Sequence, residues 1–82
     1  MQSLMECIAR DLDDWAPELA PSAKAALIQR LAGQVSGRAG WAEQRLKDGG
    51  SLSWLFDAKS SQLLVTYPNG ANRIRLVAPP RG

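Results

Sequence analysis

In residues 51–78, SLSWLFDAKSSQLLVTYPNGANRIRLVA, the apolar residues change from the helical spacing of the preceding segment to alternation. Alternating runs at 51–57, 62–67 and 72–78 predict three strands. The loop AKSS separates the first two runs. Asn69-Gly70 separates the last two, and this dipeptide is the strongest short signal for a type I′ hairpin turn. The stretch therefore predicts a three-stranded antiparallel meander.

The two turns predict the strand register independently of each other. The AKSS loop pairs Asp57 with Gln62, and a turn centred on Asn69-Gly70 pairs Val65 with Ile74. Both registers gather one apolar set on the face that helices should cover: Leu52, Trp54, Phe56, Leu63, Val65, Tyr67, Ile74 and Leu76. The opposite face then holds Ser53, Leu55, Asp57, Gln62, Leu64, Thr66, Arg73, Arg75 and Val77.

Helical spacing before residue 51 predicts two to three helices, at 3–15, 22–34 and 38–48. Ser3 and Glu6 have the spacing of a capping box at the start of the first helix. The third helix carries Trp41 on its apolar stripe, contains Gly40 and ends at Gly49-Gly50. The expected fold is α+β, with these helices packed on one face of the meander. Trp15, Trp41 and Trp54 are all expected in the core.

The length and composition limit the classes of protein to which the chain can belong. Eighty-two residues make a single domain, 1–82, with a helical part at 3–48 and the meander at 51–78. Apolar residues make up 45% and charged residues 22%, which is typical of a globular chain. One cysteine, no signal peptide at the N-terminus and no long apolar run indicate a soluble cytoplasmic protein without membrane contact. Twelve alanines, and seven arginines against three lysines, are typical of a GC-rich bacterial or phage genome.

The charges are unevenly distributed. Residues 1–20 carry five acidic residues and one arginine, a net charge of −4, and residues 21–82 carry nine basic and three acidic residues, a net charge of +6. The sum is +2. An acidic first helix and a basic remainder make the molecule dipolar, which influences the choice of partner more than the sum does.

Signals of catalysis are nearly absent. The chain has no histidine, which removes the usual general base and the commonest metal ligand. Cys7 lies on an acidic helix, which disfavours its thiolate, so a small apolar filler is expected there. The acidic cluster Asp11, Asp13, Asp14 and Glu18 lacks the spacing of a calcium loop and is expected to be a solvated face. The sequence therefore predicts a protein that is not an enzyme and needs no metal or cofactor.

The order of elements resembles, in outline over residues 22–67, the layout of winged-helix DNA-binding domains. The resemblance implies that Arg38, Arg45 and Lys47 on the third helix would enter the major groove, with Lys59 in the wing. Since a net charge of +2 is small for a surface that neutralises phosphates, transcriptional regulation through DNA is the second hypothesis.

The first hypothesis is a small protein-binding module, such as a bacterial or phage accessory or inhibitor protein that occludes its partner. Its predicted surface is the outer sheet face, made of Leu55, Leu64, Thr66, Arg73, Arg75 and Val77. Arginine beside aliphatic residues is typical of an interface core, and the partner can be another protein or a second copy in a homodimer. Arg75→Ala is expected to weaken binding without changing the melting temperature, whereas Arg81, beyond Pro79-Pro80, is expected to tolerate the change.

Overall fold

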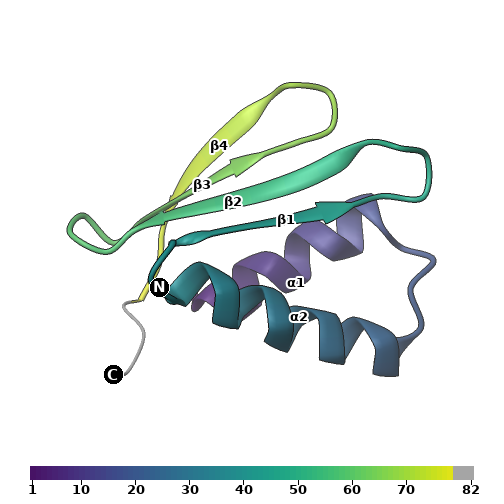
Figure 1. Cartoon of the computed structure of the whole chain (residues 1–82), viewed down its shortest axis with the longest axis horizontal. Coiled ribbons are helices and arrows are strands. Elements are labelled where there is room, and N and C mark those ends of the chain that lie inside the picture. Colours follow the sequence, from purple (N-terminus) through teal and green to yellow (C-terminus); the bar gives the residue numbers. More distant parts are fainter. Residues whose placement is uncertain (79–82) are drawn as a thin grey trace.

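The computed structural model describes residues 1–78 and has two helices followed by four strands (Figure 1). The helices are α1 (Leu4–Trp15) and α2 (Pro21–Ser36), and the strands are β1 (Trp41–Arg45), β2 (Ser51–Asp57), β3 (Gln62–Thr66) and β4 (Asn72–Leu76). The strands form one antiparallel sheet in the order β1-β2-β3-β4. The α+β fold with an antiparallel meander is confirmed, but the sheet has four strands instead of three.

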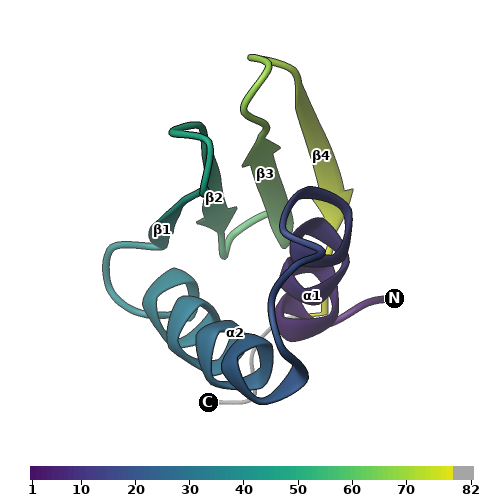
Figure 2. The same ribbon diagram turned by 90° about the vertical axis from the view of Figure 1, so that its right-hand side faces the viewer.

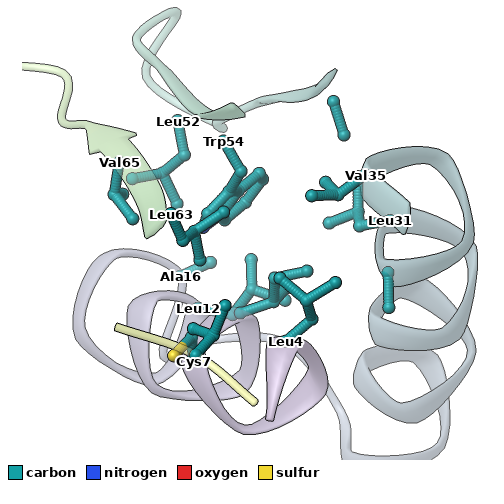
Figure 3. Close-up of a cluster of buried hydrophobic side chains, with 14 residues drawn as sticks. Leu4, Cys7, Leu12, Ala16, Leu31, Val35, Leu52, Trp54, Leu63 and Val65 are labelled. Atoms are coloured by element: carbon teal, nitrogen blue, oxygen red, sulfur yellow. The ribbon is translucent and has the colours of Figure 1, made fainter. Parts of the chain in front are cut away.

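Both helices lie on the same side of the sheet, and the other side is open (Figures 1 and 2). The core fills the space between the two layers, with side chains from α1, α2 and the inner sheet face (Figure 3). Its largest fully buried side chain is Trp54, surrounded by leucines and valines from the sheet and from both helices. One face of the sheet is therefore buried and one is free.

The first helix begins as the sequence predicts. The Ser3 side chain accepts a hydrogen bond from the Glu6 N–H, and the Glu6 carboxylate accepts one from the Ser3 N–H, both at 3.1 Å. Two otherwise unpaired N–H groups of the first turn are thus satisfied. The second helix begins with Pro21 in its first turn, where proline's missing N–H costs nothing.

The predicted third helix at 38–48 is wrong, since its residues form a loop, the strand β1 and a turn. Gly40 has a φ of +64°, which a right-handed helix cannot contain, and its carbonyl accepts a hydrogen bond from the Phe56 N–H at 2.7 Å. The helical part ends at Ser36, and Ala42 faces the core while Trp41, expected there, is on the open side and 48% exposed. Pairing with β2 has overridden the helical preference of the segment.

The β1–β2 and β3–β4 hairpins close with the same type of turn. In the second of them the N–H of Gly70 donates to the Tyr67 carbonyl, the N–H of Tyr67 donates to the Ala71 carbonyl, and Gly70 has a φ of +88°. The Asn69 side chain accepts from the Ala71 N–H at 3.0 Å. The first hairpin repeats these bonds through Leu46, Asp48, Gly49 and Gly50. Each loop therefore has three residues and ends on a glycine with positive φ.

The predicted β2–β3 register is confirmed, but the β3–β4 register is shifted by one residue. Asp57 pairs with Gln62, whereas Val65 pairs with Arg73 and not with Ile74. Pro68 explains the shift. In a two-residue turn on Asn69-Gly70, Pro68 would have to donate a ladder hydrogen bond that it lacks, while in the three-residue loop its fixed φ suits the first turn position.

The shift exchanges the two faces of β4. Ile74 and Leu76 lie on the open face and are each 61% exposed. Arg75 is opposite the buried Leu63 and faces the helices, and Val77 is fully buried. The assignment of Arg73, Arg75 and Val77 to the outer face is therefore wrong.

Candidate functional site

A row of large apolar side chains crosses the whole open face of the sheet. Trp41 pairs with Leu55, Leu55 pairs with Leu64, and Leu64 pairs with Ile74, so the row has one residue on each strand. Trp41 and Leu55 are each 48% exposed, and Leu64 is half-buried between its neighbours. Together with Leu76, these residues are called the apolar row below.

Polar but largely uncharged residues flank the apolar row. On one side Glu43, Ser53, Thr66 and Asn72 lie opposite one another on successive strands. On the other side Asp57 pairs with Gln62, and these two line a shallow hollow together with Leu55, Leu64 and Ile74. Glu43, Arg45 and Asp57 are the charged residues that the four strands present on this face. The open face thus has an apolar centre and a polar border.

The structure brings together half of the predicted partner-binding residues. Leu55, Leu64 and Thr66 lie on the open face as predicted. Arg73 lies on the helix-facing side of β4 and is exposed, and Arg75 and Val77 point inward. Trp41, Ile74 and Leu76 were missed as surface residues, and Arg81 lies outside the described residues.

Arg75 is part of a buried polar network centred on Asp11 of α1. The Asp11 carboxylate accepts hydrogen bonds from the Trp54 indole N–H at 2.9 Å and from the Tyr67 hydroxyl at 3.3 Å. The Arg75 guanidinium lies 3.4 Å from the same carboxylate, and these two side chains are 11% and 1% exposed. Trp15 stacks on Tyr67, with ring centroids 5.6 Å apart. The expectation of a solvated acidic face is therefore wrong for Asp11.

Burial controls the ionisation of this network. Desolvation raises the pKa of Asp11, and the hydrogen bond from Trp54, the Arg75 charge and the hydrogen bond from Tyr67 offset part of that rise. Burial, and then the negative charge of Asp11, raise the pKa of the Tyr67 hydroxyl, which keeps it a hydrogen-bond donor. The Arg75 Nη1 group is buried without a hydrogen-bond partner among residues 1–78, whereas its Nη2 group, Trp54, Tyr67 and Asp11 contact one another inside the fold, so the network joins α1 to the sheet.

The basic residues of the DNA-binding hypothesis do not share a helix. Arg38 follows α2, Arg45 ends β1, Lys47 lies in the β1–β2 turn and Lys59 lies in the β2–β3 turn. Consecutive turns of a meander lie at opposite ends of the sheet, so Lys47 and Lys59 are far from each other (Figure 1). The proposed recognition helix, and with it the winged-helix layout, is wrong.

Cys7 is free and fully buried. Burial raises the pKa of its thiol, which disfavours the reactive thiolate. Residues 1–78 contain no cluster of three or more side chains of the kinds that hold metal ions. Neither helix is long and apolar enough to cross a membrane.

The chain matches no protein-family model, and no curated protein and no solved structure is significantly similar to it.

Proposed function

We propose that this chain is a non-enzymatic protein-binding module whose docking surface is the open face of the sheet. The observation that carries the proposal is the apolar row, in which Trp41, Leu55, Leu64 and Ile74 come one from each strand at the same level, with Leu76 two residues further along β4. A binding module of this kind acts by covering part of its partner, as an accessory or inhibitor protein does.

The composition of the open face supports the proposal. Four of its apolar side chains are 48–61% exposed. Contiguous apolar surface with a polar border is typical of protein interfaces, whose centres are depleted of charge and enriched in aromatic residues such as Trp41.

The rigidity of the face also favours binding. Every strand beneath the apolar row is hydrogen-bonded to its neighbours, and the inner side chains Leu52, Trp54, Leu63 and Val65 are fully buried. The buried network of Asp11 fixes β2 and β4 from below. A surface that is already ordered loses little entropy on binding.

The free, buried Cys7 favours a reducing compartment, and we propose a cytoplasmic location on that basis. Fractionation of host cells tests this location: the protein should appear in the same fraction as a cytoplasmic marker protein.

Site-specific photo-crosslinking tests the docking surface directly. A photoreactive phenylalanine analogue at Leu55 on the open face should give discrete crosslinked proteins in the native host. The same analogue at Ala26, on the exposed side of α2, is the matched control and should give none. Excess unlabelled protein should remove the Leu55 products. Equal products from both positions, or products from Ala26 alone, would exclude the open face as the docking surface.

A further inference from the structure

We infer that the open face docks a second copy of this chain, with the two sheets packed face to face around a two-fold axis. This inference rests on the proposed function, because it names the partner of the same surface. Three properties of the apolar row carry it: its symmetry, the charges beside it and its size.

The apolar row is complementary to itself. The two-fold axis lies between the two facing sheets, parallel to the strands and level with the gap between β2 and β3. It brings β1 of one copy over β4 of the other, and β2 over β3. Trp41 then faces Ile74 of the second copy, and Leu55 faces Leu64 of the second copy. Aligned packing of two sheets about 10 Å apart interdigitates such side chains.

The same operation brings no like charges together. Glu43 lies at the level of Asn72 and faces that amide in the second copy. Asp57 pairs with Gln62 within one sheet and faces Gln62 of the second copy across the interface. Each carboxylate therefore meets a side-chain amide, which can donate a hydrogen bond. A strongly basic or acidic partner would find no complementary charge at the centre of this face.

The face is small for an interface between two copies. Four strands about 4.8 Å apart, and five to seven residues of about 3.3 Å each, give roughly 300–450 Å² in projection. A standard interface buries about 800 Å² on each partner. The dimer is therefore of the weak, reversible class, and its population depends on concentration.

Sedimentation equilibrium of the wild-type chain from about 10 µM to about 1 mM, the range of a weak interface, measures this dimer. Leu55→Lys and Ile74→Lys each place a charge in the apolar row and should raise the dissociation constant by about tenfold or more. Ala26→Lys on α2 is the matched control and should leave it unchanged. Unchanged circular dichroism and melting temperature at low concentration show that the variants remain folded.

A wild-type chain that is monomeric at about 1 mM overturns the inference, and so does a dimer that neither Leu55→Lys nor Ile74→Lys weakens. These failures are distinguishable from failure of the proposed function. If the chain is monomeric but Leu55 crosslinks to a different host protein, the open face docks another protein and only the second copy is excluded. If the chain is monomeric and Leu55 gives no crosslink, both proposals fail.

Discussion

The indole N–H of Trp54 donates a hydrogen bond to the Asp11 carboxylate at 2.9 Å, which joins the centre of the sheet to the first helix inside the core. Trp54 is fully buried, so its N–H has no access to water in the folded state. The same carboxylate contacts Tyr67 and Arg75, which come from the end of β3 and from β4. One aspartate thereby fixes the helix against three parts of the sheet.

Trp54→Phe removes the indole donor and leaves one carboxylate oxygen of Asp11 without this bond. We expect the free energy of unfolding to fall by at least about 1–3 kcal/mol, the cost of an unsatisfied buried acceptor. Urea denaturation, monitored by circular dichroism, measures this free energy. Trp41→Phe, on the open face, is the matched control and should change stability by less than about 0.5 kcal/mol at low concentration. Equal losses in the two variants would contradict the buried bond.

Arg75→Ala removes the cation that faces Asp11 inside the fold. Breaking a buried ion pair leaves a charge uncompensated, so we expect a loss of about 3 kcal/mol and a clearly lower melting temperature. The sequence alone predicted an unchanged melting temperature, because it placed Arg75 outside. Arg73→Ala removes an exposed arginine two positions away and should have little effect. Differential scanning calorimetry of both variants decides whether Arg75 is structural.

The stability of the protein should carry a pH dependence that comes from Asp11. Desolvation raises the pKa of Asp11 in the native state above its ordinary value of 3.8, so the native state holds the proton more tightly than the unfolded state. This contribution to stability is complete below pH 3.8 and is lost as the pH rises through the native pKa. The free energy of unfolding of the wild type minus that of Asp11→Asn should therefore fall over this window. A difference that rises with pH would show that the native pKa is depressed.

The substitutions Gly33→Ala and Gly40→Ala should have opposite effects on the stability of the protein. A methyl group at Gly33 meets open space on α2, so Gly33→Ala should stabilise the protein by about 1 kcal/mol. Gly40 has a φ of +64°, and a methyl group there would lie 2.9 Å from the Phe56 carbonyl oxygen. Gly40→Ala should destabilise it by about 1–2 kcal/mol or more. If residues 38–48 were helical, both substitutions would stabilise, and thermal unfolding distinguishes the two cases.

Local signals were sufficient for the elements whose contacts are close in sequence. The capping box of Ser3 and Glu6 and the loop between Asp57 and Gln62 fixed α1 and the β2–β3 register correctly. The strand β1 was missed because alanine, glutamate, glutamine and arginine favour helices. A signal was nevertheless present. Asp48-Gly49 is a hairpin dipeptide like Asn69-Gly70, and it makes the same hydrogen bonds.

The positions of the arginines could not be obtained from periodicity. Arginines and aliphatic residues alternate in β4, so the same pattern is compatible with either set facing inward. The turn decides between them, and Pro68 selects the three-residue loop. The buried partner of Arg75 is Asp11, which lies at the other end of the chain and leaves no mark in the local sequence.

The register of β3 against β4 places Ile74 in the apolar row and Arg75 beside Asp11, so both the open face and the buried network depend on it. The N–H of Tyr67 bonds to the Ala71 carbonyl, so alternation along the ladder makes Leu64 and Ile74 a non-hydrogen-bonded pair, in which the two Hα atoms approach closely. A two-dimensional nuclear Overhauser spectrum should show a strong cross-peak between the Hα atoms of Leu64 and Ile74. A cross-peak between the Hα atoms of Val65 and Ile74 instead would turn Ile74 inward and contradict both the apolar row and the buried pair of Arg75 with Asp11.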